Sequence, residues 1–110
     1  MANTFRLATK SNVGVTTVGI YTAPTSTTST IIGITLANVS GSGINVTVGI
    51  ARSVGVGDNV SILKNVPIPQ GSTLEVMQGN KIVLEDSDSL TAKSDVNDSL
   101  DCAITILEMT

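Results

Sequence analysis

The segment from Thr30 to Ile50 alternates apolar side chains with small ones on both sides of a Ser-Gly-Ser-Gly sequence. Successive side chains of a β-strand point to opposite faces, so a two-residue alternation predicts strands that bury one face. No stretch of ten or more residues in the chain shows the 3.6-residue period of a helix. The pattern therefore predicts an all-β protein in which this segment forms a central hairpin.

The two faces of this predicted hairpin differ in character. The apolar face supplies the expected centre of the core, which consists of Ile32, Ile34, Leu36, Ile44, Val46, Val48 and Ile50. The opposite face is small and uncharged, and we interpret it as a surface that lies against another protein. With one residue from the preceding segment, this candidate interface comprises Thr16, Gly33, Thr35, Ala37, Asn45, Thr47, Gly49 and Ala51.

The distribution of charge supports this interpretation. Charged residues make up 14% of the chain, against about 25% in a typical soluble domain. The 41 residues from 11 to 51 contain no Asp, Glu, Lys or Arg. Exposed edge strands usually carry charges that prevent edge-to-edge pairing, so we expect this half of the chain to be covered in an assembly. A hydroxyl-rich β-domain that stays soluble without these charges is the alternative.

The rest of the chain also reads as short strands separated by Gly, Pro, Asn and Asp turns. Residues 74–77 and 82–85 are expected to form a hairpin around residues 78–80, and residues 10–14 a turn. The last strand is apolar on both faces, which predicts an internal or covered position. Eight or nine mostly antiparallel strands with no helix predict one β-sandwich or jelly roll domain over residues 1–110. The further strands are predicted at 4–9, 15–22, 60–66, 74–77, 82–85, 90–94 and 101–109.

Composition excludes several classes of chemistry. The chain has no His, no Trp, one Phe, one Tyr and one Cys, so Ser-His-Asp triads, histidine zinc sites and disulfides within the chain are excluded. We predict no catalytic residue, no cofactor and no metal ligand. The net charge of −3 and the scarcity of aromatic residues argue against nucleic acid as a partner. No apolar segment is long enough for a membrane span or signal peptide, which predicts a protein used without secretion.

Two further features are weighed as ligand sites. Residues 85–101 hold six acidic residues, placed in two turns that flank one predicted strand: Glu85, Asp86, Asp88, Asp95, Asp98 and Asp101. Each turn offers two or three oxygens where calcium takes six to eight, and no EF-hand spacing is present, so we expect a solvated acidic rim, with calcium binding left open. The glycine-rich loop around Gly55 and Gly57 precedes no helix and is not predicted to bind phosphate.

Four segments of the chain carry a likeness to known proteins: residues 3–10, 20–34, 64–74 and 81–90. They resemble small all-β virion proteins of tailed bacteriophages, especially marine phages of the cyanophage kind. The resemblance covers nearly the whole chain and concerns strand pattern and turn sequences, with no catalytic signature. It implies a structural component present in many copies on the capsid, neck, tail or baseplate, and it carries over no functional residues.

These observations lead to one functional hypothesis and two alternatives. The hypothesis is a non-enzymatic capsid decoration or cement protein that stabilises the particle through repeated sheet-face and edge-strand contacts. Its expected partners are copies of itself, possibly as a trimer, and the major capsid or tail protein, in a virion assembled in the host cytoplasm. The alternatives are a neck, tail or baseplate component, and a carbohydrate- or host-receptor-binding β-module.

Overall fold

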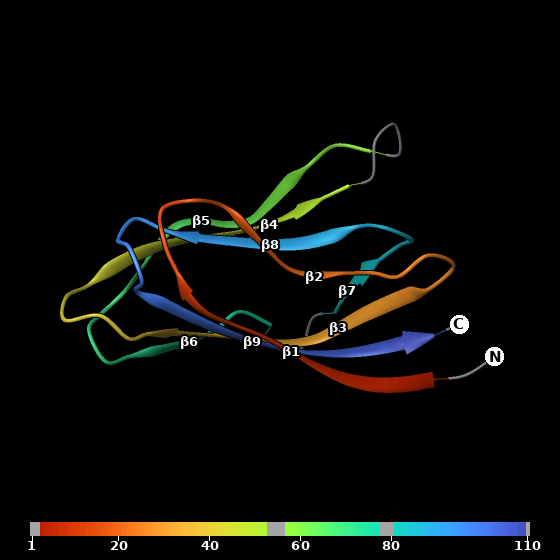
Figure 1. Ribbon diagram of the computed structural model, residues 1–110, viewed down its shortest axis with the longest axis horizontal. Coiled ribbons are helices and arrows are strands. Elements are labelled where there is room, and N and C mark those ends of the chain that lie inside the picture. The colour runs from red at the N-terminus through yellow and green to blue at the C-terminus, as the bar shows by residue number, and fades with distance from the viewer. Residues whose placement is uncertain (1–2, 53–56, 78–80, 110) are drawn as a thin grey trace.

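The computed structural model describes residues 3–52, 57–77 and 81–109, which form nine β-strands. Five strands make one antiparallel sheet, called sheet A, in the order β1-β9-β3-β6 with β7 also paired to β3; four make sheet B, in the order β2-β8-β4-β5. Figure 1 shows the sheets as two stacked layers. The strands are β1 (Asn3–Val13), β2 (Val18–Thr22), β3 (Thr28–Asn38), β4 (Ile44–Ala51), β5 (Val60–Ile68), β6 (Thr73–Glu75), β7 (Ile82–Leu84), β8 (Ser89–Ser94) and β9 (Leu100–Met109).

The strand pairing is that of one long antiparallel hairpin, in which the first half of the chain pairs with the second half, wrapped into two layers. The first strand pairs with the last, β2 with β8, β3 with both β6 and β7, and β4 with β5. With β6 and β7 taken as one interrupted strand, this is the eight-strand order of a jelly roll. The prediction of an all-β sandwich without helix is confirmed for the described residues. Within those residues, no helix is present that is long and apolar enough to cross a membrane.

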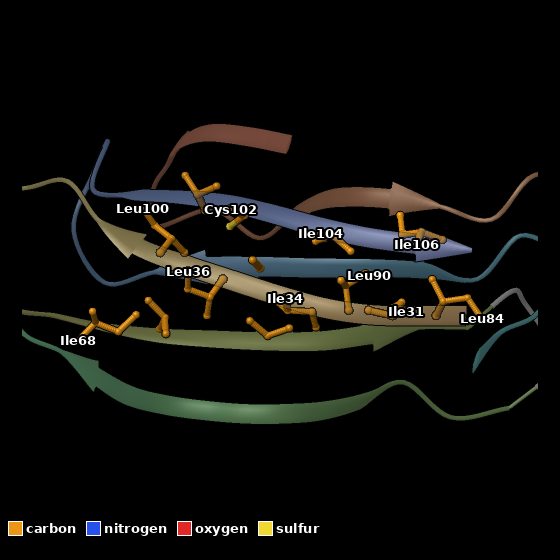
Figure 2. Close-up of a cluster of buried hydrophobic side chains, with 14 of the residues drawn as sticks. Ile31, Ile34, Leu36, Ile68, Leu84, Leu90, Leu100, Cys102, Ile104 and Ile106 are labelled. Atoms are coloured by element: carbon orange, nitrogen blue, oxygen red, sulfur yellow. The ribbon is translucent and has the colours of Figure 1, made fainter. Parts of the chain in front are cut away.

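The core lies between the two sheets. Ile34, Leu36 and Ile104 of sheet A meet Val48 and Leu90 of sheet B, and all five side chains are fully buried. Figure 2 shows these sheet A side chains with Leu90 in the space between the layers. Burying one such side chain is worth about 1.5–3 kcal/mol, so this alternating apolar face is the main stabilising feature of the fold.

The prediction that Ile32 belongs to the core is wrong. The pairing of β3 with β9 shifts between Ile31 and Gly33, and such a bulge inserts one extra residue that moves the alternation to the other face. Ile31 is therefore fully buried, while Ile32 is 36% exposed. Beyond the bulge the expected pattern holds for Ile34 and Leu36.

The predicted central hairpin is also wrong, because β3 and β4 lie in different sheets. The link between them crosses from sheet A to sheet B and is held by Asn38, whose side chain is buried. Its amide nitrogen donates to the carbonyl oxygens of Ser42, at 2.8 Å, and Ile68, at 2.9 Å. The Ser-Gly-Ser-Gly sequence therefore forms a corner between the sheets.

Two smaller predictions are corrected and one is confirmed. β6 and β7 do not pair with each other; both pair with β3, at Leu36 and Thr30 respectively, while the predicted turn at 78–80 lies outside the described residues. Residues 10–13 continue β1 through an irregular register. β9, predicted to be internal, lies between β1 and β3.

Candidate assembly surfaces

The first acidic turn is tied to Arg52 at the end of β4. The Asp88 side chain is 2% exposed, and its Oδ2 lies 2.9 Å from Arg52 Nε. This contact is an ion pair. Arg52 Nη2 also contacts Glu85 Oε1 at 2.6 Å, and Asp88 Oδ2 accepts a hydrogen bond from the backbone N–H of Glu85. Asp88, and to a smaller extent Glu85, raises the pKa of the Arg52 guanidinium.

Three other carboxylates accept hydrogen bonds from backbone N–H groups. Asp86 accepts from the N–H of Ser26, which lowers the pKa of that carboxyl, and Ser87 lowers it further. Asp95 and Asp101 accept from the N–H groups of Asn45 and Asn12. The two acidic turns lie at opposite ends of β8, which is one of the two arrangements that their positions in the sequence allowed. In the described part of the chain, no three His, Cys, Asp or Glu residues are grouped to hold a metal ion.

A polar cluster joins the sheets near the end of β9. Glu108 Oε1 accepts from Arg6 Nε at 2.7 Å, and its Oε2 accepts from the Tyr21 hydroxyl at 2.5 Å. The same hydroxyl lies 2.7 Å from Ser29 Oγ. Burial, with help from Glu108, raises the pKa of Tyr21 to about 12, and the Tyr21 hydrogen bond lowers the pKa of Glu108. The cluster links β2 of sheet B to three strands of sheet A.

This cluster predicts a loss of stability in acid. Because the pKa of Glu108 is lower in the folded protein than the ordinary 4.5, the unfolded chain takes up the proton first, so the contribution of Glu108 is complete above pH ~4.5 and is lost as the pH falls through its folded pKa. We expect Glu108→Gln to lower the urea midpoint at pH 7 and to have a much smaller effect at pH 3. Exposed Glu75→Gln is the control, and an effect of Glu108→Gln that is equal at both pH values would contradict this role.

Cys102 is not a reactive site. Its side chain lies in the core, and burial raises the pKa of the thiol to about 12. The thiol is therefore protonated near neutral pH, and the protonated form is a poor nucleophile.

The outer surface of sheet A carries the largest exposed apolar side chains. Phe5 and Leu7 of β1 are 73% and 69% exposed, and Val83 of β7 is 54% exposed. They share this surface with Leu107 and Met109 of β9, because the register places Phe5, Leu107, Thr30 and Val83 in one row across the sheet. We call this surface face A. It comprises Phe5, Leu7, Thr9, Thr30, Ile32, Gly33, Thr35, Ala37, Val83, Ala103, Thr105, Leu107 and Met109.

Face A is hollowed at one end. A depression of about 530 Å³ lies over small side chains of three strands, Thr9 of β1, Thr35 and Ala37 of β3, and Ala103 of β9, with Lys10 and Asp101 at its rim. The large side chains lie toward the opposite end of the same strands. Face A therefore has a raised apolar end and a hollow end.

The outer surface of sheet B, called face B, is more polar. A depression of about 400 Å³ there is lined by hydroxyl and amide groups together with the side chains of Lys64 and Lys93. Gly49 is one of its lining residues, and a Cβ there would sit 2.8 Å from the carbonyl oxygen of Val60. β4 and β5 thus approach too closely at this point for any side chain.

The structure divides the eight residues of the predicted interface between opposite sides of the molecule. Gly33, Thr35 and Ala37 lie on face A, and Thr16 lies in the exposed link between β1 and β2. The remaining four lie on face B: Asn45, Thr47, Gly49 and Ala51. One flat contact cannot hold all of them. Sequence reasoning missed Phe5 and Leu7, although their alternation on an edge strand beside the two-sided apolar β9 was the available signal.

β1 is the long open edge of sheet A. It has 11 residues, contains no proline, and pairs with β9 alone among the described strands. An unpaired strand edge can accept a strand from another chain, and charged side chains guard against indiscriminate pairing. Arg6 and Lys10 supply such charges on β1.

Comparisons with known proteins identify the fold. No protein-family model and no curated protein matches the chain. A chain of the Bacillus endospore appendages, which form disulfide-linked pili, matches with 15% identity over 99% of this chain and 87% of its own, at a TM-score of 0.59. A chain of the acid-stable capsid of Helicobacter pylori bacteriophage KHP30 matches with 9% identity, 99% and 89% coverage, and a TM-score of 0.59.

A third structure, a chain of the T13 viral particle of IBDV, is 12% identical and has a TM-score of 0.59. This chain aligns over 96% of its length and spans 30% of that viral chain. At these identities the likeness concerns the backbone arrangement. The protein shares its β-sandwich fold with subunits of a bacterial pilus and of two viral particles.

Proposed function

We propose that the protein is a non-enzymatic structural subunit of a virus particle. The observation that carries this proposal is face A, a broad outer sheet surface with strongly exposed Phe5, Leu7 and Val83, beside which the carboxylates Glu75 and Asp101 lie at the hollow end. Exposed apolar patches of this kind mark interaction sites on soluble proteins. Several charged groups elsewhere, among them Arg6, Arg52 and Asp88, are engaged in ties between strands or turns.

The shared fold supports the same proposal. The three solved chains belong to a pilus and to two viral particles, which are repeated assemblies. Together with the resemblance to small virion proteins of tailed, marine-type phages, this favours a subunit present in many copies. We place it as a decoration or cement protein on the capsid, with the major capsid protein as its partner; a neck, tail or baseplate position is the alternative.

The mechanism would be a weak contact that buries apolar surface and is repeated in every copy on the particle. A standard interface covers about 800 Å² on each partner, and each apolar Å² removed from water is worth about 25 cal/mol before the cost of association. A sheet face supplies the apolar area, and the open edge of β1 offers backbone hydrogen bonds to a neighbouring strand. Many copies on one particle bind together more firmly than one contact alone would.

The proposal is tested on intact particles of the phage that carries the gene. We expect mass spectrometry of purified virions to find the chain in many copies, and electron cryomicroscopy to show its sandwich with face A or the β1 edge covered by a neighbour. Density in which both surfaces face solvent, or virions that lack the chain, would overturn the proposal.

A further inference from the structure

The large and small side chains of face A are arranged so that one copy of this face is complementary in shape to another. The row Leu7–Thr105–Gly33 crosses the middle of the sheet. One step along the strands on one side lies the row of Phe5 and Leu107. One step on the other side lies the row Thr9–Ala103–Thr35, which opens into the hollow. Large residues and small residues therefore stand at equal distances from the central row.

We propose that two copies of this chain associate through face A about a two-fold axis that runs along the central row. This inference rests on the proposed function as a structural subunit and names its first partner, a second copy. Rotation about that axis lays each strand antiparallel on its own copy. Leu107 then lies over Ala103 of the second copy, and Phe5 enters the end of the hollow near Thr9.

The size of face A agrees with such a contact. A ten-residue strand is about 34 Å long and four strands side by side are about 19 Å wide, so the sheet presents about 650 Å² before side-chain relief is added. This is close to the ~800 Å² per partner of a standard interface. The hollow of about 530 Å³ falls in the range of pockets that enclose whole ligands of about 300–1,000 Å³, which leaves room for an aromatic ring.

The charge distribution permits the same contact. A two-fold interface places identical surfaces against each other, so any charge near the axis meets its own copy. Leu7, Thr105 and Gly33 carry no charge, and neither do their neighbours Leu107 and Ala103. The carboxylates of Glu75 and Asp101 also project from this surface. Glu75 lies beside Thr35 on the outer strand β6, and Asp101 lies beside Ala37 near the end of β9, so both are at the margin of the contact.

The test places a charge on the axis. Thr105 is exposed, so Thr105→Arg and Thr105→Glu are expected to fold. Sedimentation velocity should show dimers for the wild type, and each variant alone should dimerise at least about 100-fold more weakly, because like charges meet. An equimolar mixture of the two variants should recover the dimer, since opposite charges then face each other. Ser61→Arg, at an exposed position on β5, is the matched control and should dimerise like the wild type.

Other outcomes overturn the inference. A strict monomer up to about 1 mM, a trimer, a dimer unaffected by Thr105→Arg, or a mixture that stays monomeric would each exclude this two-fold contact. Incorporation into virions separates the two proposals: a monomer that is still found in particles ends only the dimer. A chain that neither associates nor enters particles ends both. Circular dichroism spectra that match the wild type show that each variant is folded.

Discussion

Replacing Ile104 by alanine is expected to lower the free energy of unfolding by about 2–5 kcal/mol. Ile104 is fully buried in the middle of β9, and its neighbours across the sheet are Ala8 of β1 and Ile34 of β3. The truncation removes apolar burial and leaves a cavity where three strands and the facing sheet meet. Against a total stability of about 5–15 kcal/mol this is a large fraction, and the melting temperature should fall by roughly 10 °C or more.

Urea denaturation followed by circular dichroism measures this change, because the chain has no Trp and a single Tyr as fluorophores. Val60→Ala is the matched control. Val60 is 54% exposed at the edge of sheet B, and its truncation should change the stability by less than about 0.5 kcal/mol. Equal losses for the two variants would contradict the placement of the core between the sheets.

Asp88→Ala is expected to cost about 2–3 kcal/mol, the second largest effect. The carboxylate is buried, faces Arg52, and accepts the backbone N–H of Glu85, and bonds to charged groups contribute about 1.5–3 kcal/mol. Removing one partner of a fully buried pair costs about 3–5 kcal/mol. The expected loss is smaller here because the Arg52 side chain is 24% exposed and keeps Glu85 as a partner.

The variant Glu85→Ala separates the effect of burying a carboxylate from the effect of its charge, because Glu85 and Asp88 bind the same guanidinium of Arg52. The Glu85 side chain is 66% exposed, and exposed ion pairs contribute about 0–1 kcal/mol. Urea midpoints of the two variants at pH 7 provide the comparison. A loss for Glu85→Ala as large as that for Asp88→Ala would show that Arg52 is held mainly from the solvent side.

The strands could largely be predicted from sequence, but their partners could not. β9 is apolar on both faces, which indicated an internal strand, and the structure agrees. The alternation around the Ser-Gly-Ser-Gly sequence is the same for a hairpin and for a corner between two sheets. The buried Asn38, which binds the carbonyl oxygens of Ser42 and Ile68, decides between them. Ile32 was misplaced because a bulge has no signature in a run of Ile residues.

The candidate surfaces could be predicted only in part. The two-residue alternation predicted that Gly33 and Thr35 face away from the core, and the register of β3 agrees. It could not show that Thr47 and Gly49 lie on the other side of the sandwich, because that depends on which sheet receives each strand. Phe5 and Leu7 lie outside the charge-free stretch, next to Arg6, and only the pairing of β1 with β9 brings them onto face A.

The pairing of the first strand with the last also sets the order of events during folding. Arg6 and Glu108, which are 102 positions apart in sequence, become neighbours only when the ribbon closes. Chains dominated by such distant contacts fold in milliseconds to seconds, against microseconds to milliseconds for helical bundles. During translation β1 therefore leaves the ribosome long before β9 exists, and its apolar edge has no cognate strand until synthesis of β9 is complete.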